Sequence, residues 1–365
     1  MKQGRKILFG PLPPPTGGVS VFMTALSGPA IENGVTVWTY TGESVYRESK
    51  NPVFVNHRRL AHIWALLRSG FGGRITDSTH FHLEYPSLIG LPVWLAAKFI
   101  LRFRWIKVLH DGSLPERHGS FSAIRRFLFR LAVRNIDEFI IFNRELEQWI
   151  SEKTGFAGPI SRTSVFLPLP KCWGEGEIPA RIKVPLDKFA KHRKRVSTVG
   201  FFISSYGFSH IVEAIELLRQ ETGEDIGLLI AAGGGVTDEQ FKAEVLNGRD
   251  WIDVVIEAPH SIVASIYRQS DVFVRGFGHE SFGLARLEAM ICGTPVVATN
   301  VGETRGMLLY EFGDVAELAR QIRAVLDGKS AADAQMWTDR FQKEAGDNLA
   351  AYLQAIIGEP CLTDA

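Results

Sequence analysis

The sequence of 365 residues contains little cysteine and no long apolar run. Its three cysteines, Cys172, Cys292 and Cys361, are widely spaced, which indicates a reducing compartment and neither a disulfide framework nor a zinc site. No run of about 18 apolar residues is present. The opening MKQGRKILFG passes from polar residues directly into a strand pattern, without the apolar core of a signal peptide. We therefore expect a cytoplasmic protein.

Two other absences limit the chemistry. No G-x-G-x-x-G follows the first strand pattern, which disfavours a dinucleotide-dependent dehydrogenase. His80 and His82 are spaced like two metal ligands on one face of a strand, but no Asp-x-Asp and no third ligand accompany them. We therefore assign both histidines to structural or acceptor-side roles and predict no metal site.

Charge is divided unevenly along a nearly neutral chain. The net charge is +1, but residues 1–170 hold 21 Lys and Arg against 12 Asp and Glu, whereas residues 171–365 hold 20 against 28. The excess of +9 in the first half would attract anionic lipid headgroups or a phosphorylated lipid carrier, and the acidic second half would stay in solvent. An anionic membrane surface is therefore an expected partner, with the protein peripheral on the inner face of the membrane.

Much of this positive charge lies in two segments that also carry aromatic residues. In residues 121–134, Arg126, Arg130 and Arg134 share one helical face, and residues 98–107 interleave four cations with Phe and Trp. The four cations of the second segment are Lys98, Arg102, Arg104 and Lys107. An ordinary amphipathic helix packed on a sheet would give the first pattern as well.

Strand-like and helix-like runs alternate along the whole chain, without an internal repeat. Strands are expected at 6–10, 35–40, 79–85, 105–110, 138–142, 195–202, 226–235, 253–258, 271–275 and 293–302. Helices are expected at 19–32, 57–69, 87–101, 120–134, 144–153, 209–222, 237–246, 261–270, 282–291 and 314–327. The alternation predicts an α/β protein with two doubly wound Rossmann-like domains facing across a cleft. The proline-rich FLPLPKCW separates domain 1–168 from domain 169–344.

Two glutamates separated by seven residues in HESFGLARLEAM are the most informative feature of the chain. If Ser281 caps a helix that Phe282 opens, Glu280 precedes free backbone N–H groups, and the second glutamate lies about two turns inside, roughly 10 Å away. That distance suits a nucleoside diphosphate sugar. Glu280 would accept hydrogen bonds from the hydroxyl groups of a hexose, and Glu288 would accept them from those of a ribose, while the helix N-terminus faces the diphosphate. A capped surface helix with two solvated glutamates would show the same pair.

The context favours the ligand interpretation, because the expected helix 282–291 connects two strands of a parallel sheet, whose ligands bind at the strands' carboxyl ends. The run ESFGLARLEAMICGTPVVATNVG resembles the donor-sugar motif of the retaining GT-B-fold glycosyltransferases of family four. The resemblance implies a catalytic role for Glu280 and makes 169–344 the donor domain and 1–168 the acceptor-side domain, completed by a last helix at about 345–365. The residues to which it gives a donor-binding role are Ser281, Phe282, Gly283, Leu284 and Glu288.

Two further features match the family. Gly17 and Gly18 lie between a strand and a helix, where the lack of a Cβ permits a positive φ and a close phosphate, although a tight turn alone would also favour glycine. They resemble the family's Gly-Gly loop near the donor diphosphate. His110 ends the strand pattern WIKVLH, and the resemblance puts it near the sugar, where it would donate a hydrogen bond or stabilise developing charge. A purely structural histidine is the alternative.

One departure from the family is the loss of two cations. After RVSTVG the family usually has an Arg and, five residues later, a Lys, which neutralise the leaving diphosphate; here these positions are Phe201 and Tyr206. The candidate replacements are Arg275, Arg286 and Arg305. We favour Arg275 as a catalytic residue because it ends a strand beside the donor loop. A salt bridge between Arg275 and a surface carboxylate such as Glu303 is the alternative.

The resemblance implies a retaining hexosyltransferase that moves a hexose from a nucleotide sugar, preferably UDP-glucose, to a glycan or lipid-linked acceptor. No carboxylate outside the glutamate pair is placed as a covalent nucleophile, and a diphosphate oxygen would deprotonate the acceptor. We expect no metal, no other cofactor and no nucleic-acid partner. The alternative from another class is a catalytically silent sugar-nucleotide-binding subunit, because Phe201 and Tyr206 remove the usual cations.

Overall fold

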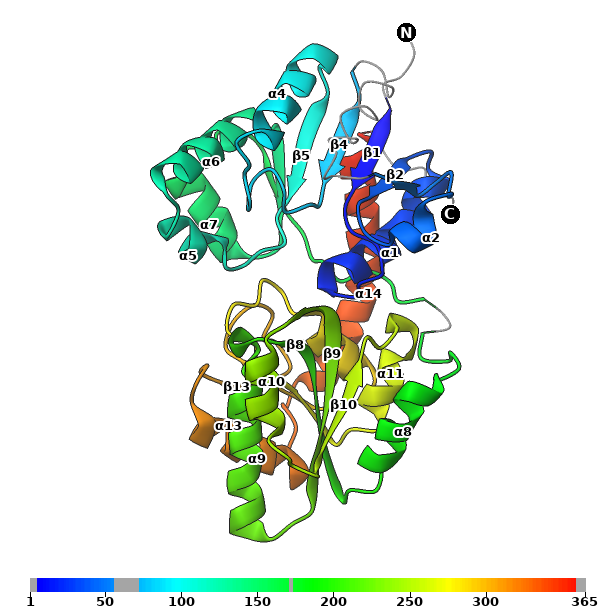
Figure 1. The fold of residues 1–365 in the computed structure, drawn as a ribbon, viewed down its shortest axis with the longest axis vertical. Coiled ribbons are helices and arrows are strands. Elements are labelled where there is room, and N and C mark those ends of the chain that lie inside the picture. Colours follow the sequence, from blue (N-terminus) through cyan, green and yellow to red (C-terminus); the bar gives the residue numbers. More distant parts are fainter. Residues whose placement is uncertain (1–4, 56–71, 171–172, 359–365) are drawn as a thin grey trace. The chain divides into compact units, whose positions relative to one another are not determined.

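A computed structural model of the chain describes residues 5–55, 72–170 and 173–358. The contacts within it define two compact units. Unit 1 comprises Met1–Pro14, Val19–Pro168 and Ala345–Ala365, and unit 2 comprises Pro15–Gly18 and Leu169–Glu344. Each unit contains one parallel sheet with helices on both faces (Figure 1). The predicted fold class of two Rossmann-like domains is thereby confirmed.

Unit 1 is built on seven parallel strands in the order β3-β2-β1-β4-β5-β6-β7. The strands are β1 (Lys6–Phe9), β2 (Thr36–Thr39), β3 (Val53–Phe54), β4 (Arg74–Asp77), β5 (Arg104–Val108), β6 (Glu138–Ile141) and β7 (Ile160–Arg162). Central strands such as EFII of β6 are buried along their whole length, because helices cover both faces of the sheet. The strand order reverses between β1 and β4, and in such sheets ligands bind at the carboxyl ends of the strands beside this reversal.

The helices of unit 1 cover both faces of its sheet. They are α1 (Gly18–Glu32), α2 (Glu43–Tyr46), α4 (Gly90–Leu101), α5 (Leu114–Gly119), α6 (Ala123–Asn135) and α7 (Arg144–Lys153). Figure 1 shows α4, α6 and α7 on one side of the strands and α1 on the other. The long α14 (Ala334–Ile357) begins in unit 2, and its residues from Ala345 onward belong to unit 1, where Tyr352 packs against Phe22 of α1.

Unit 2 is built on six parallel strands in the order β10-β9-β8-β11-β12-β13, which reverses between β8 and β11. The strands are β8 (Lys194–Phe202), β9 (Ile226–Thr237), β10 (Ile252–Ile256), β11 (Val272–Arg275), β12 (Val296–Thr299) and β13 (Leu308–Tyr310). The helices are α8 (Ala180–Phe189), η2 (Ser204–Tyr206), α9 (Phe208–Thr222), α10 (Glu239–Leu246), α11 (His260–Arg268), α12 (Leu284–Ile291) and α13 (Val315–Leu326). Apolar residues of α9, α10 and α13 form the core on one face, and those of α8 and α11 form the core on the other.

The expected strand 79–85 is wrong, because this segment forms a turn-rich loop after β4. Side chains there bond to nearby backbone groups in place of a neighbouring strand: Asp77 Oδ1 accepts from the N–H of Thr79, and Thr79 Oγ1 accepts from that of Phe81. The alternation of polar and apolar residues in THFHLEY therefore does not reflect strand pairing. The expected helix 57–69 lies outside the described residues.

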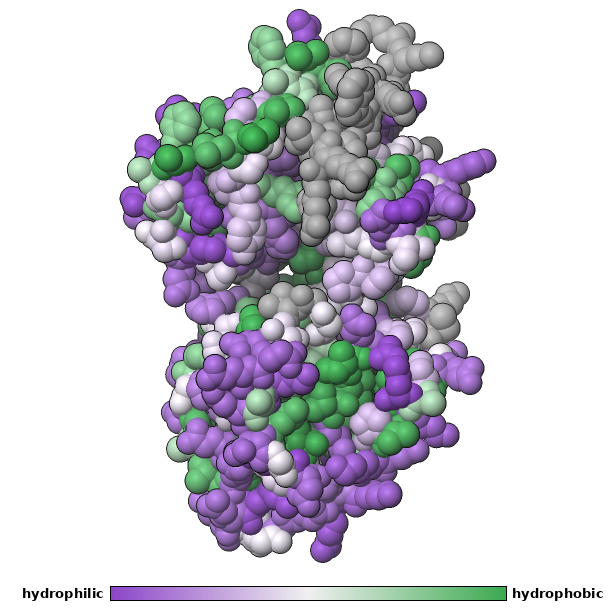
Figure 2. Space-filling view, viewed as in Figure 1, coloured by the Kyte–Doolittle hydropathy of each residue, from purple (hydrophilic) through white to green (hydrophobic). Residues whose placement is uncertain are grey.

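Apolar side chains are exposed on the outer faces of α4 and α6, among them Phe99 and Phe127. Figure 2 shows hydrophobic residues gathered on the surface over these two helices. In the described part of the chain, no helix is both long enough and apolar enough to cross a bilayer.

Candidate active site

A salt bridge occupies the carboxyl edge of the unit 2 sheet where the strand order reverses. Arg275, the last residue of β11, donates from Nε to Glu280 Oε2 at 2.7 Å and from Nη1 to the carbonyl oxygen of Val199 at 2.7 Å. Val199 lies on β8, the strand on the other side of the reversal. Arg275 therefore connects both strands of the expected ligand edge to the loop that carries Glu280.

The guanidinium of Arg275 lies beside one of the two positions that lack the family's cations. Its Cζ is 5.0 Å from the ring centroid of Tyr206 and 5.3 Å from that of Phe277, and these two rings stack 4.4 Å apart. Tyr206 in turn contacts Phe201 edge to face at 5.5 Å. The guanidinium of Arg275 therefore packs against the aromatic pair of Tyr206 and Phe277.

Charge stabilises both members of the pair. Burial acts to raise the pKa of Glu280, but Arg275 and then Arg286 outweigh it and hold the pKa below its ordinary value. Burial likewise acts to lower the pKa of Arg275, and Glu280 and Tyr206 outweigh it, so that pKa is raised. Glu280 is thus an ionised, buried carboxylate. The alternative of a bridge from Arg275 to Glu303 is wrong, since Arg275 bonds to Glu280.

Arg286, a candidate replacement cation, donates its hydrogen bonds mainly to backbone carbonyl oxygens. Its side chain is fully buried, and Nη1 donates to the carbonyl oxygens of Val301 at 2.5 Å and Glu303 at 2.9 Å, while Nη2 donates to Thr299 Oγ1 at 2.9 Å. Burial lowers its pKa to about 10, partly offset by Glu280. Arg286 therefore fixes the loop after β12.

Arg305, the third candidate, is held at the start of α14. Its Nε donates to Glu303 Oε1 at 2.7 Å, and its Cζ lies 4.3 Å from the ring centroid of Trp337 and 5.2 Å from that of Phe341. Of the three arginines, Arg275 alone ends a strand at the reversal of the sheet.

The helix that carries Glu288 begins later than expected. Helix α12 starts at Leu284, and its N-cap is Gly283, with φ 99° and ψ 56°, so the predictions that Ser281 caps the helix and Phe282 opens it are wrong. The positive φ turns the chain between Phe282 and Leu284, which a continuous helix does not allow. Ser281 and Phe282 belong to the preceding loop, and the carbonyl oxygen of Phe282 accepts from the N–H of Glu303 at 2.8 Å.

Glu288 lies inside α12, and each of its two carboxylate oxygens has a hydrogen-bond partner on α11. His260 Nε2 lies 2.7 Å from Glu288 Oε1, and the Tyr267 hydroxyl donates to Oε2 at 3.2 Å. His260 and Tyr267 are two turns apart on α11, so they share one face of that helix. Burial, then Glu288, raises the pKa of Tyr267 well above its ordinary value, so the hydroxyl remains a donor. Neither partner was predicted from the sequence, in which their spacing of seven residues along α11 was the available signal.

The glycine pair has a different conformation from the one expected. Neither Gly17 nor Gly18 has a positive φ, so the prediction of a left-handed turn there is wrong. Gly18 opens α1, and a Cβ at this position would meet no atom within 4 Å. A Cβ at Gly17 would lie 3.8 Å from Phe201 Cζ, at ordinary contact distance. The pair leaves open space at the start of α1.

His110 follows β5 in unit 1 as an uncharged histidine. Its Nε2 is buried and finds no hydrogen-bond partner among the described residues, while its ring packs on Phe22 at 5.2 Å and Phe142 at 5.0 Å. Burial, followed by the charges of His80 and Lys107, lowers the pKa of His110 to about 3. A neutral imidazole at this carboxyl edge can donate or accept one hydrogen bond through Nε2.

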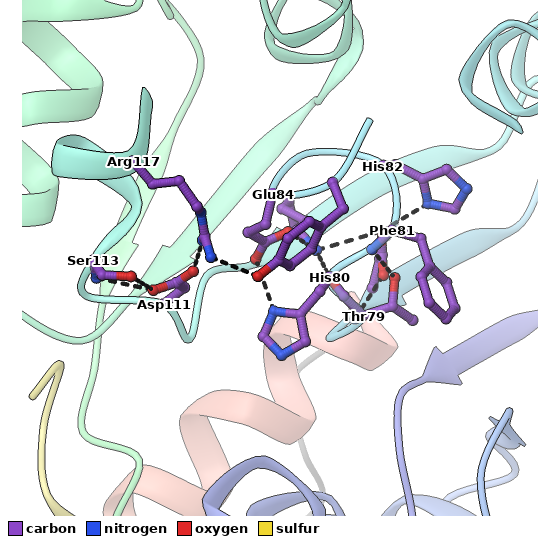
Figure 3. A network of polar contacts seen from close by, with 11 residues as sticks. Thr79, His80, Phe81, His82, Glu84, Asp111, Ser113 and Arg117 are labelled. Atoms are coloured by element: carbon purple, nitrogen blue, oxygen red, sulfur yellow. Dashed lines mark hydrogen bonds and ion pairs between the residues drawn. The ribbon is translucent and has the colours of Figure 1, made fainter. Parts of the chain in front are cut away.

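A polar network surrounds the loop after β4 (Figure 3). Lys107 is fully buried, donates to the carbonyl oxygen of Thr79, and lies 3.3 Å from Glu84 Oε2 and 3.7 Å from Asp77 Oδ2. The expectation that Lys107 belongs to a basic surface segment is therefore wrong. His80 Nδ1 lies 3.6 Å from Glu84 Oε1.

At the open side of this network, Arg117 donates to the Tyr85 hydroxyl at 2.7 Å, stacks over its ring at 4.7 Å and pairs with Asp111. Figure 3 shows Arg117, Asp111 and Ser113 on one side and Glu84 and His80 on the other. His82 stacks on Trp94 at 4.3 Å, so the two histidines do not share a strand face. No group of three potential metal-binding side chains occurs within residues 5–55, 72–170 and 173–358.

The chain is similar to several known proteins. Residues 186–343 match the family model described as Glycosyl transferases group 1. The chain is 34% identical over 137 residues to the D-inositol 3-phosphate glycosyltransferase of Pseudarthrobacter chlorophenolicus, covering 36% of this chain and 30% of that protein. It is 30% identical over 179 residues to the 2-deoxystreptamine glucosyltransferase of Streptomyces kanamyceticus, covering 45% and 46%. The chain thus spans less than half the length of these curated relatives.

Solved structures cover nearly the whole chain. Anabaena Alr3699/HepE in complex with UDP-glucose matches with a TM-score of 0.69 and 17% identity over 97% of this chain and 98% of that one. The E. coli trehalose-6-phosphate protein bound with UDP-2-fluoro glucose matches with a TM-score of 0.67 and 12% identity over 97% and 98%. At such identities the likeness establishes the fold. The chain therefore has the GT-B fold, and its residues 186–343 are similar to the family described as Glycosyl transferases group 1.

Proposed function

We propose that the chain is a retaining glycosyltransferase that moves a hexose from a nucleotide sugar, with UDP-glucose preferred, to a glycan or lipid-linked acceptor. The observation that carries the proposal is the position of Arg275, which ends β11, bonds to β8 across the reversal of strand order and pairs with Glu280. A fixed cation at this edge suits the diphosphate of a donor. The names of the matched relatives supply the reaction class.

Arg275 would act as the positive group that the family places at Phe201 and Tyr206. Negative charge grows on the diphosphate as its bond to the sugar breaks, so a guanidinium held in place by Glu280 and Val199 stabilises the transition state more than the ground state. Because Arg275 is already bonded to Glu280 and to Val199 before the donor binds, its side chain would move little during the reaction. A diphosphate oxygen then takes the proton of the acceptor hydroxyl, and no metal is required.

Glu280 and Glu288 would recognise different parts of the donor. Glu280 lies in the loop before α12 and would accept hydrogen bonds from the hydroxyl groups of the hexose. Glu288, held by His260 and Tyr267, would accept hydrogen bonds from the hydroxyl groups of the ribose. The bonds from α11 fix the orientation of the Glu288 carboxylate before any nucleotide binds.

On the acceptor side, we assign His110 and an anionic membrane partner to unit 1. Neutral His110 would donate its Nε2 hydrogen to a sugar hydroxyl, since burial keeps its pKa low. The charge excess in residues 1–170 supports a membrane partner.

Thermal shift with a panel of nucleotide sugars, followed by an assay of UDP release, tests the proposal. We expect UDP-glucose to raise the melting temperature most and to be turned over. Binding without any turnover, with or without candidate acceptors, would favour the silent nucleotide-sugar-binding subunit. The aromatic residues Phe201 and Tyr206 are the observation behind that second candidate. A panel without any stabilising nucleotide would contradict both.

A further inference from the structure

Helix α4 is apolar on both its inner and its outer face. Its inner residues Leu91, Trp94, Ala97 and Leu101 are buried in the core of unit 1. Its outer surface is formed by Ile89, Pro92, Ala96, Phe99 and Ile100, whose spacing of three or four residues is that of one helical stripe. A surface helix ordinarily presents polar residues to water, and an apolar outer stripe indicates a surface that something covers.

The exposure is large and extends to the neighbouring helix. Phe99 is 84% exposed and Ile89 68%. Helix α6 packs beside α4 and exposes Phe127 by 64% and Ile124 by 58%. Together these residues form an apolar surface on one side of the unit, which we call the α4–α6 face.

Cations without an ion-pair partner among the described residues accompany the two helices of the α4–α6 face. Residues 88–135 contain nine Lys and Arg against two Asp and Glu. In the part of the chain that the structure describes, one arginine at the end of α4 and three arginines of α6 make no ion pair. They are Arg102, Arg125, Arg130 and Arg134.

Arg102 has an unusual backbone for an arginine. It caps α4 with φ 53° and ψ 38°, the left-handed conformation in which glycine is the usual residue. Arg102 lines a pocket of about 670 Å³ together with Lys98, Phe99 and Arg104. A residue kept in a conformation that glycine would adopt more easily points to a role for its side chain.

The pocket lies at the amino-terminal edge of the unit 1 sheet. Arg104 begins β5, and Asp137, which also lines the pocket, directly precedes β6. His110 follows the opposite, carboxyl end of β5. The pocket is therefore separate from the edge at which we place acceptor chemistry.

We propose that the α4–α6 face docks on an anionic lipid bilayer, with Phe99, Ile100 and Phe127 inserted and a lipid phosphate in the pocket at Arg102. The inference gives a surface to the membrane partner proposed above and needs no transfer activity. Apolar side chains bordered by unpaired cations match the two layers of an anionic membrane surface, acyl chain and headgroup. A second copy of the chain would bring arginine against arginine, which opposes a symmetric dimer through this face.

Cosedimentation with phosphatidylcholine vesicles, with and without phosphatidylglycerol, tests the docking surface. We expect the wild type to bind only the vesicles that contain phosphatidylglycerol. Phe99→Asn should lower the partition coefficient by about tenfold through the lost insertion. Arg102→Gly should lower it by about fivefold, for one basic residue at the surface. Because glycine favours the left-handed backbone conformation at position 102, the melting temperature of the Arg102→Gly variant should not fall. Weaker vesicle binding by this variant would therefore not reflect misfolding.

Matched control variants are available in unit 2. Val184→Asn removes a 70% exposed apolar residue from α8, and Arg193→Gly removes an exposed arginine from a bend, so both should bind vesicles as the wild type does. Binding that is absent, independent of phosphatidylglycerol, or equal in all variants would overturn the proposal. So would a vesicle-free dimer that Phe99→Asn dissociates, which would assign the face to a second copy. Thermal shift with UDP-glucose on the same samples tests the proposed function separately.

Discussion

Arg275 Nε lies 2.7 Å from Glu280 Oε2, and this pair connects the end of a central strand to the loop that precedes α12. Both side chains are about nine-tenths buried, so neither charge is screened well by water. Removal of one member leaves the other charge buried without its partner. The pair can therefore be tested only by variants that separate its effect on folding from its effect on catalysis.

Replacement of Arg275 should abolish most activity. Arg275→Met alone should destabilise the fold by about 3–5 kcal/mol, because Glu280 stays buried without a counter-charge. The double variant Arg275→Met/Glu280→Gln should regain stability but release UDP from UDP-glucose at least about a hundredfold more slowly than Glu280→Gln alone. Urea unfolding and an assay of UDP release measure the two effects. Arg305→Ala is the control, and a double variant as fast as Glu280→Gln would remove Arg275 from the mechanism.

The two glutamates should differ in the ligands they recognise. Glu288→Gln should weaken UDP and UDP-glucose by about tenfold each, as expected for a lost charged hydrogen bond to the ribose. Glu280→Gln should leave UDP affinity within about twofold and reduce turnover, because its proposed partner is the hexose. Isothermal titration with both ligands measures the difference. Equal losses of UDP affinity in the two variants would contradict separate roles.

A methyl group at Gly283 should be more harmful than one at another glycine of similar backbone. Gly283 has φ 99°, and a Cβ there would lie 2.9 Å from Arg286 Cδ and 3.2 Å from Glu280 Cγ. Gly328 has φ 94° and open space around it. Gly328→Ala should cost about 1 kcal/mol of stability, and Gly283→Ala roughly 2–4 kcal/mol with weaker donor binding. Thermal and urea unfolding compare them, and equal costs would mean that the donor loop tolerates the crowding.

Acid should destabilise the protein partly through His110. The folded pKa of about 3 lies below the ordinary 6.5, so between these values the unfolded chain binds a proton that the folded chain does not. This stabilising contribution is complete above about pH 6.5 and is lost as the pH falls toward 3. From pH 7 to pH 5, the wild type should lose roughly 1–2 kcal/mol more than His110→Gln. Urea unfolding at both pH values measures the loss, and identical slopes for the two proteins would show that His110 titrates normally.

The sequence predicted most of the strands because their signal is local, but it missed β3, β4, β7 and β13. Parallel strands buried on both faces appear as short apolar runs, and EFII, DVFVR and PVVAT each became a strand. The loop 79–85 was mistaken for a strand because bonds from Asp77 and Thr79 to the backbone replace strand pairing without changing the apolar alternation.

The site was predicted less completely because its contacts are distant in the sequence. Three arginines stand near the donor motif, and only burial and bonding distinguish Arg275, which meets Glu280, from Arg286, which is consumed by carbonyl oxygens. The partners of Glu288 come from α11, 21 and 28 residues earlier. The start of α12 depends on the φ of Gly283, which the capping pattern of Ser281 concealed.

Under the proposed membrane docking, the length of β5 bears on the reach of a lipid-linked acceptor. Arg104, at one end, lines the proposed headgroup pocket, and His110 follows the other end. The six residue steps from Arg104 to His110 span about 20 Å at roughly 3.3 Å each. An acceptor whose acyl chains stay in the bilayer would then extend its reactive hydroxyl over a comparable distance. The length of the strand would thus favour acceptors with several polar units between lipid and sugar over glycolipids with a single sugar.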